Sequence, residues 1–154
     1  MKLWHDMQKW NEYCSQDGCP VCNKRGEEKT EEVAGVLIKQ LRVSKLSAFR
    51  ANPTKGYCCL TSVPHAIELF DLTEEDALDF MRDLRLSAKV LKDVTGAIKI
   101  NYDIHGNTIP HLHVHLFPRQ TTDCLDKPPT TAVGATYAEG EFETFVESMK
   151  RRLQ

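Results

Sequence analysis

Residues 110–119 form the most informative segment of the chain and read Pro-His-Leu-His-Val-His-Leu-Phe-Pro-Arg. Within this segment, histidine alternates strictly with an aliphatic residue. Successive side chains of a β-strand point to opposite faces, so the pattern predicts a strand over residues 111–117. Its aliphatic face belongs to the core, and its other face carries three histidines, His111, His113 and His115.

Three imidazole rings on one strand face contribute little apolar burial, and neighbours on that face lie about 6.5–7 Å apart. A single histidine in a strand is usually structural, whereas three in strict alternation indicate a chemical role. One such role is metal ligation, since imidazole is a good zinc ligand and three histidines form known catalytic zinc sites. The other is nucleophilic catalysis, in which one imidazole attacks and its neighbours orient it or supply protons. The alternation alone does not choose between these roles.

The segments that precede the histidines predict further strands. Val, Ile and Leu are frequent in residues 33–50, which we interpret as two short strands split near residues 40–44. Residues 57–63 form another β-prone run, and residues 97–102 also read as a strand, so two more strands are predicted. Because these strands do not alternate regularly with helices, they favour an α+β domain with a largely antiparallel sheet.

Three helices are also predicted. A short amphipathic helix fits the first dozen residues, a long helix runs from about Leu72 to Thr95, and a last one begins near Gly140. The long helix has Thr73 as its N-cap, acidic residues in its first turn and Gly96 as its stop. Its predicted apolar face consists of Ala77, Phe80, Met81, Leu84, Ala88 and Leu91.

The composition limits the classes of partner. The 154 residues are enough for one domain, which we expect to span residues 1–154. Its 20 Lys and Arg residues are balanced by 22 Asp and Glu residues, so no basic excess predicts nucleic-acid binding. No apolar run approaches the roughly 20 residues of a membrane span, and residues 1–6 do not resemble a secretory signal. We therefore expect a cytoplasmic protein with neither a nucleic-acid nor a membrane partner.

The chain contains six cysteines, which in such a protein are more typical of reduced thiols or metal ligands than of disulfides. Two of them form the sequence Cys19-Pro-Val-Cys22, a spacing that places two thiolates on one cation. A redox-active dithiol is the alternative interpretation. Cys14 is an alternative thiolate ligand, and a metal site would need two further ligands from elsewhere in the chain.

The histidine segment resembles the signature of the histidine-triad (HIT) superfamily, in which three histidines alternate with apolar residues. Asn107-Thr108 stand four and three residues before His111, where family members carry Gln-Ser or Gln-Thr. The resemblance covers roughly residues 15–120 and leaves a C-terminal loop and helix, residues 120–154, outside the family core. It implies a HIT-like fold, with a mainly antiparallel sheet of about five strands, one long central helix, and N- and C-terminal helices.

The resemblance also implies roles for individual side chains. In the family the middle histidine, here His113, attacks the α-phosphorus of a nucleotide, and water then hydrolyses the nucleotidyl-histidine. Imidazole suits this role because it is neutral and nucleophilic near pH 7. His115 would contact the phosphate oxygens or the leaving group. Contacts to phosphate and ribose are expected from four further side chains, Asn107, Thr108, Asn101 and Asn52.

A metal site follows from the same resemblance. Family members that bind zinc combine a CxxC pair with a histidine before the long helix and with the first histidine of the triad. Here these positions are occupied by Cys19, Cys22, His65 and His111. The resemblance thus implies a structural zinc ion, fully coordinated by protein, with His113 left free to act as the nucleophile.

The leading hypothesis is a nucleotide hydrolase or transferase that cleaves at the α-phosphate of a dinucleoside polyphosphate or a nucleoside phosphoramidate. A purine nucleotide or dinucleotide would be its small-molecule partner. One alternative is a nucleotide-binding module with little turnover, and the other is a zinc hydrolase with the triad histidines on the metal. Because known family members are often two-fold dimers whose sheets join into one, a homodimer is implied as well.

Overall fold

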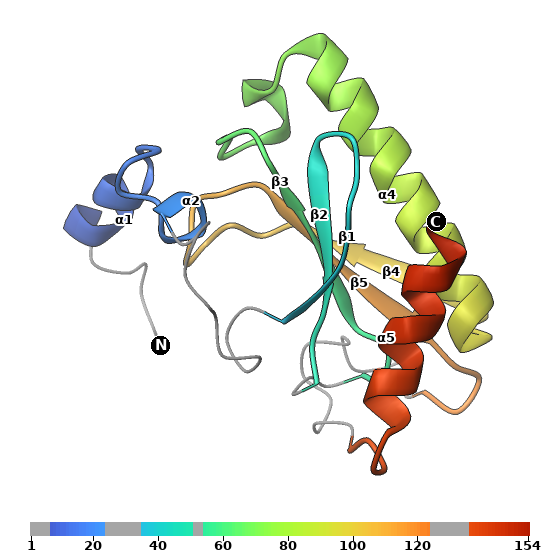
Figure 1. Cartoon of the computed structure of the whole chain (residues 1–154). Coiled ribbons are helices and arrows are strands. Elements are labelled where there is room, and N and C mark those ends of the chain that lie inside the picture. The colour runs from blue at the N-terminus through green and yellow to red at the C-terminus, as the bar shows by residue number, and fades with distance from the viewer. Residues whose placement is uncertain (1–6, 24–34, 51–53, 124–135) are drawn as a thin grey trace.

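The computed structural model describes residues 7–23, 35–50, 54–123 and 136–154 and is built around one β-sheet (Figure 1). Asn52 lies outside these ranges. Leu3, which belongs to the predicted N-terminal helix, also lies outside them. In chain order the elements are α1 (Met7–Tyr13), α2 (Pro20–Asn23), β1 (Val36–Gln40), β2 (Ser44–Ala48), β3 (Cys58–Ser62), η1 (Leu69–Asp71), α4 (Glu74–Thr95), β4 (Lys99–Asp103), β5 (His113–Arg119) and α5 (Glu141–Arg152).

The sheet has five strands in the order β1-β2-β3-β5-β4, and every neighbouring pair is antiparallel. The histidine strand β5 therefore lies inside the sheet, between β3 and β4, while β1 and β4 form its edges. The predicted α+β class, the sheet of about five strands and the long helix are all confirmed. The short helix α2, which contains part of the CxxC sequence, was not predicted.

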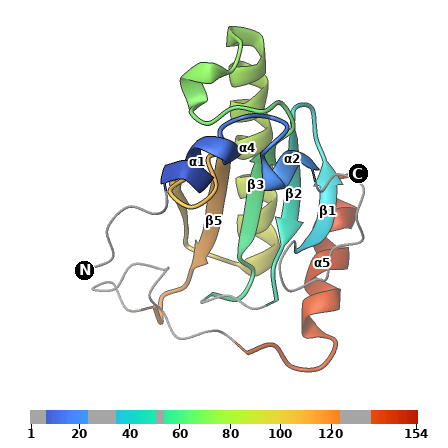
Figure 2. The ribbon, with the colours of Figure 1, turned by 90° about the vertical axis from the view of Figure 1, so that its left-hand side faces the viewer.

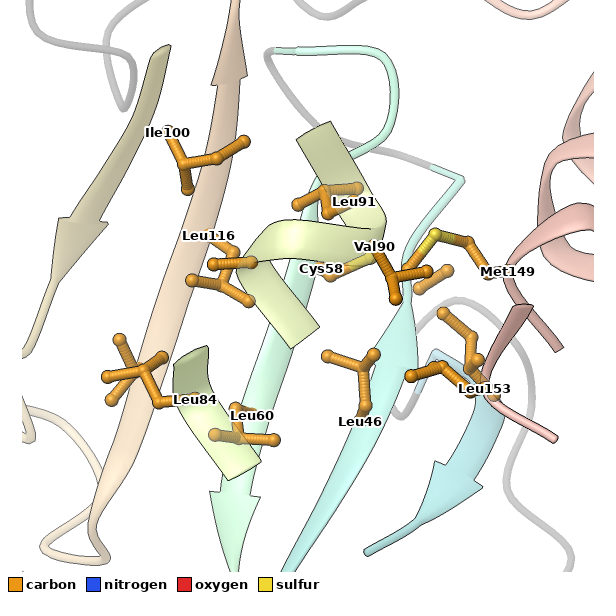
Figure 3. Close-up of a cluster of buried hydrophobic side chains, with 14 of the residues drawn as sticks. Leu46, Cys58, Leu60, Leu84, Val90, Leu91, Ile100, Leu116, Met149 and Leu153 are labelled. Atoms are coloured by element: carbon orange, nitrogen blue, oxygen red, sulfur yellow. The ribbon is translucent and has the colours of Figure 1, made fainter. Parts of the chain in front are cut away.

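The helices lie on both sides of the sheet. Helices α4 and α5 cover one face, and the short helices α1 and α2 lie on the opposite side (Figures 1 and 2). The main core fills the space between the sheet and α4 and α5, where side chains such as Leu46, Leu60 and Leu91 are completely buried (Figure 3). Burial of this apolar surface supplies the main free energy of folding. Within the described residues, no helix has the length and apolar character that crossing a membrane requires.

Both long helices begin and bury their faces largely as the sequence predicts. The Thr73 side chain caps α4 by accepting the Asp76 backbone N–H, and Gly96 ends the helix in the left-handed conformation at φ 65°. Helix α5 begins at Glu141 and buries three apolar side chains, Phe142, Val146 and Met149.

The prediction for one side chain of α4 was wrong. Met81 was expected on the apolar face, yet it is 49% exposed. The buried stripe of the helix includes Asp83, Ser87 and Val90, so it is rotated away from Met81. A polar side chain at a buried position was not anticipated by the apolar pattern.

The start of the histidine strand was also predicted wrongly. The strand begins at His113 rather than His111. Ahead of it the backbone makes local bonds, from the His111 N–H to the Ile109 carbonyl and from the Leu112 N–H to the Ala66 carbonyl. These bonds divert the two N–H groups from the ladder, so that its last pair with β3 is Thr61 and His113, although the Leu112 carbonyl still accepts the Ser62 N–H. The aliphatic residues of the alternation are buried, as predicted.

A buried carboxylate joins α4 to the β1–β2 hairpin. Asp83 is 2% exposed, and its oxygens accept hydrogen bonds from the backbone N–H groups of Arg42 and Val43 at 3.3 and 3.0 Å. The Ser44 hydroxyl donates a third bond at 2.7 Å. One side chain thus satisfies three donors of the hairpin that the turn itself leaves without partners.

Replacement of Asp83 by alanine is expected to lower the free energy of unfolding by about 3 kcal/mol, because three donors would lose a charged acceptor. Chemical denaturation followed by circular dichroism measures the change. Asp93→Ala is the matched control, since Asp93 is exposed on the same helix and should change stability by less than about 0.5 kcal/mol. Equal losses in both variants would show that the hairpin does not depend on Asp83.

Candidate functional site

His111 connects two clusters of chemically active side chains. It is completely buried, and its ring Nδ1 lies 3.4 Å from the Cys19 sulfur and 3.7 Å from the Cys22 sulfur. Its backbone carbonyl accepts a 2.6 Å hydrogen bond from Nδ1 of His113. One residue therefore contributes its side chain to one cluster and its main chain to the other.

The first cluster contains four groups that are able to hold a metal ion, Cys19, Cys22, His65 and His111, whose ligand atoms all lie within 4.8 Å of one another. The cysteines come together because Pro20 begins the single turn of α2 between them. The Cys22 sulfur lies 3.4 Å from Nδ1 of His65. Tetrahedral zinc with usual bond lengths separates a sulfur and a nitrogen ligand by about 3.6 Å, so the spacing of the cluster fits this ion.

The orientation of the two imidazoles in this cluster fits a metal as well. Nε2 of His65 donates to the Cys14 carbonyl at 2.9 Å, and Nε2 of His111 donates to the Ser62 carbonyl at 2.9 Å. Because neutral imidazole carries one ring proton, Nδ1 of each ring then offers a lone pair toward the sulfurs. Hydrogen bonds of this kind are typical supports of metal-binding histidines. Cys14 contributes its carbonyl oxygen to this arrangement and is not part of the cluster.

The second cluster contains His113 and His115, at the end of β5 nearest the metal-binding cluster. Their rings meet edge to face with centroids 4.8 Å apart. A backbone carbonyl only accepts hydrogen bonds, so the bond to His111 places the ring proton of neutral His113 on Nδ1. Nε2 of His113 therefore carries the lone pair that a nucleophile requires.

His115 has an unusually low affinity for protons. Burial and the neighbouring His113 and His105 lower the pKa of its ring to about 4, while Asp103 acts weakly in the opposite sense. The Tyr57 hydroxyl lies 2.5 Å from Nδ1 of His115. At neutral pH the ring is therefore uncharged, although it stands among other polar groups.

The sequence alone indicates no role for Tyr57. It is 6% exposed and packs against Phe49 and Phe117, with ring centroids 5.4 and 5.0 Å away. No local pattern identifies it, because its partner His115 is far along the chain. Only the pairing of β3 with β5, in which Cys59 faces His115, brings the two side chains to the same region of the sheet.

The side chains that were expected to contact phosphate differ in their exposure and in the elements to which they belong. Asn107 and Thr108 are exposed in the connection between β4 and β5, and Asn101 is half-buried on β4 opposite Phe117. Among the described residues, these three side chains make no hydrogen bond to the rings of His113 and His115. His105, from the same connection, approaches His115 with ring centroids 5.9 Å apart, so this connection does lie beside the second cluster.

Comparison with known proteins identifies the family. The sequence profile of the HIT domain matches residues 29–122. The chain belongs to the HIT domain family. The CxxC sequence of this HIT protein precedes the matched region, whereas His65 and the triad lie within it. A search of curated protein sequences finds no match.

Solved structures have the same fold as this HIT protein. A histidine triad protein from Sinorhizobium meliloti 1021 is 26% identical with a TM-score of 0.69, covering 82% of this chain and 95% of its own. A Zn-bound histidine triad family protein from Mycobacterium smegmatis is 16% identical with a TM-score of 0.59, covering 79% and 85%. The diadenosine triphosphate hydrolase of Plasmodium falciparum in complex with Cyclomarin A is 14% identical with a TM-score of 0.59, covering 92% and 96%.

The low pKa of His115 predicts a specific pH dependence. Its pKa is about 4 in the folded protein, against 6.5 in an unperturbed chain. The unfolded chain takes up this proton first as the pH falls, so the contribution of neutral His115 to stability is complete above pH 6.5 and is lost toward pH 4. An NMR titration of the histidine rings should give a midpoint near 4 for His115. A midpoint near 6.5 would contradict the burial that the structure describes.

Proposed function

We propose that this protein is a nucleotide hydrolase or transferase that cleaves at the α-phosphate through a nucleotidyl-histidine intermediate on His113. The hydrogen bond from Nδ1 of His113 to the His111 carbonyl carries the proposal, because it directs the lone pair of Nε2 away from the backbone. Membership of the HIT family and the fold shared with a diadenosine triphosphate hydrolase support it.

The proposed reaction has two steps. Nε2 of His113 attacks the α-phosphorus, so that a new P–N bond forms while the bond from phosphorus to the leaving group breaks. That bond is P–O in a dinucleoside polyphosphate and P–N in a phosphoramidate, and its electron pair leaves with the oxygen or the nitrogen. Water then attacks the same phosphorus, which breaks the P–N bond and restores the imidazole. If another acceptor replaces water, the same chemistry transfers the nucleotide.

Phosphate binding is proposed for the connection between β4 and β5 together with His115. Asn107 and Thr108 are exposed and thus accessible to a ligand, and Asn101 lies on the neighbouring strand. Hydrogen bonds from such side chains would stabilise the charge that develops on the phosphate oxygens. Asn52 retains its proposed role at the ribose as a sequence-based prediction. A purine nucleotide or dinucleotide is the proposed ligand.

Structural zinc is proposed for the cluster of Cys19, Cys22, His65 and His111. The two sulfurs and two imidazole nitrogens are the donor set that zinc prefers in closed sites, and a solved HIT structure carries bound zinc. A bound Zn²⁺ would supply a cross-link rather than catalysis, because four protein ligands leave no open coordination position. The alternative zinc hydrolase is disfavoured, since neither His113 nor His115 belongs to the described cluster.

A homodimer is proposed through the β4 edge of the sheet. The strand β4 has only one neighbour among the described strands. Large apolar side chains are exposed near it: one precedes the strand, one follows it, and one lies on α4. These side chains are Ile98, Ile104 and Met81, with exposures of 58%, 53% and 49%. Unpaired strand edges and apolar patches of this kind are typical of association surfaces.

The reaction is tested by mass spectrometry of the intact protein, after brief mixing with an adenosine phosphoramidate or a dinucleoside polyphosphate. The wild type should gain the mass of one nucleotide, measured under neutral denaturing conditions, and retain one zinc ion under native conditions. His113→Ala should lose the adduct, with turnover reduced by a factor on the order of 10³ or more, yet retain its zinc. Bound nucleotide without adduct or turnover in the wild type would favour the binding module, and loss of zinc from His113→Ala would contradict the assigned ligands.

The metal site is tested by a pair of cysteine variants. Cys22→Ser should lose zinc and lower the melting temperature by at least about 5 °C. At this chain length, each 1 kcal/mol in the free energy of unfolding corresponds to about 2–4 °C, so the expected decrease corresponds to a loss of about 1–3 kcal/mol or more. Cys14→Ser is the matched control, since Cys14 is not part of the described cluster and its carbonyl oxygen, which bonds His65, is kept in serine. Metal analysis and thermal denaturation measure both effects. Equal zinc contents in the two variants would refute the assignment of Cys22.

The dimer is tested by sedimentation of variants at the two edges of the sheet. Ile98→Glu should convert the dimer to a monomer, because it places a charge on the proposed interface. Leu37→Glu changes a residue of similar exposure, 48%, on the opposite edge strand β1 and should leave the dimer intact. A wild-type monomer at concentrations above 100 μM would exclude a stable dimer.

A further inference from the structure

Tyr57 is hydrogen-bonded to one of the two histidines on which the proposed chemistry depends. We propose that Tyr57 is a positioning residue that holds the single proton of neutral His115 on Nε2, so that His115 presents an N–H donor beside the nucleophilic nitrogen of His113. The use of that donor on a phosphate oxygen rests on the proposed function. The position of the proton itself does not.

The geometry between the two side chains is well defined. The Tyr57 hydroxyl lies 2.5 Å from Nδ1 of His115, and the two rings are nearly parallel, with an interplanar angle of 22° and centroids 5.8 Å apart. Tyr57 is 6% exposed, and its ring is fixed between Phe49 and Phe117. The hydroxyl therefore cannot turn to solvent without the loss of this packing.

The direction of the hydrogen bond follows from donors and acceptors. A neutral imidazole has one nitrogen with a proton and one with a lone pair. If Nδ1 of His115 carried the proton, the buried phenol hydrogen would have no acceptor among the described residues, a costly arrangement. If the phenol donates to Nδ1, both groups are satisfied and the imidazole proton lies on Nε2. Burial also raises the pKa of Tyr57, so the phenol keeps its proton.

The other groups around His115 do not compete for Nδ1. They come from every neighbouring element: His113 on β5, Asp103 on β4, His105 in the connection that follows β4, and Cys59 on β3. Asp103 approaches Nε2 of His105 at 3.8 Å, and Cys59 approaches the Thr61 hydroxyl at 3.8 Å. Of the described residues, only Tyr57 makes a hydrogen bond to the His115 ring.

The consequence is a pair of adjacent histidines in opposite tautomers. His113 has its proton on Nδ1 and its lone pair on Nε2, because its partner is a carbonyl. His115 has its proton on Nε2, because its partner is a phenol. One ring is thereby suited to attack phosphorus, and the other to donate a hydrogen bond to a phosphate oxygen without the transfer of its proton. A positive charge beside the nucleophile is not required.

The test is long-range ¹H–¹⁵N correlation NMR of the zinc-loaded, full-length protein labelled with ¹⁵N-histidine, at pH 7. In the wild type, Nε2 of His115 should have the shift of a protonated ring nitrogen and Nδ1 that of an unprotonated one. Tyr57→Phe should remove this preference and average the two shifts. Tyr137→Phe is the matched control, because the Tyr137 hydroxyl accepts the N–H of Gly56, the residue before Tyr57, and within the described residues it makes no hydrogen bond to a histidine. It should leave the His115 tautomer unchanged.

Two results would overturn the proposal: a proton on Nδ1 of His115 in the wild type, or an unchanged tautomer in folded Tyr57→Phe. If that variant does not fold, site-specific 3-fluorotyrosine at position 57 replaces it. The fluorinated phenol is a stronger donor, so the Nδ1 shift of His115 should move, and an unmoved shift would also overturn the proposal. In kinetics, Tyr57→Phe should lower kcat by about tenfold, less than the 10²–10³ typical for loss of a transition-state donor, because His115 can still donate from Nε2 in one of its two tautomers. The tautomer is measured without substrate, so a failure of the proposed function is distinguishable.

Discussion

The position of His111 is the constraint on which the site depends. Its ring is buried among Cys19, Cys22 and His65, and its carbonyl fixes the ring of His113. One residue therefore links the two clusters, through its side chain to one and through its main chain to the other. The segment before α4, the N-terminal turn α2 and the triad strand thus meet at one residue. In the proposed function, a metal ion held by the four-residue cluster would support His113 without being part of the chemistry.

The two faces of the sheet have different roles: one packs into the core, and the other carries the histidines. One face of β3 and β5 carries Leu60, Val114 and Leu116 toward α4, where large apolar side chains are fully buried. On the other face of the sheet, the alternate residues of β5 are the histidines, which lie opposite residues of β3. The partly buried setting of this face keeps His115 neutral and strengthens the short hydrogen bonds that orient both rings. Tautomers are thus set by fixed neighbours rather than by solvent.

Local patterns predicted much of the architecture, and the resemblance to the HIT family supplied the residues expected in both clusters. Strand alternation, the Thr73 cap and the Gly96 stop depend on neighbouring residues, so the sequence contains them directly. Features that depend on distant contacts could not be predicted. Asp83 looks like a surface acid until the β1–β2 turn is placed against α4, and Tyr57 looks like a strand aromatic until β3 is paired with β5. The start of the strand was predicted wrongly for the same reason: the Leu112 N–H donates to the carbonyl of the distant residue Ala66, so the strand begins at His113.

We propose that Nε2 of His113 forms the bond to phosphorus because Nδ1 is occupied by the His111 carbonyl. The most direct test is ³¹P–¹⁵N NMR of the trapped nucleotidyl adduct on protein labelled with ¹⁵N-histidine. The structure predicts that phosphorus couples directly to Nε2 of His113, while Nδ1 keeps its proton and its bond to the carbonyl. Phosphorus on Nδ1, or on any other side chain, would contradict this account of the site.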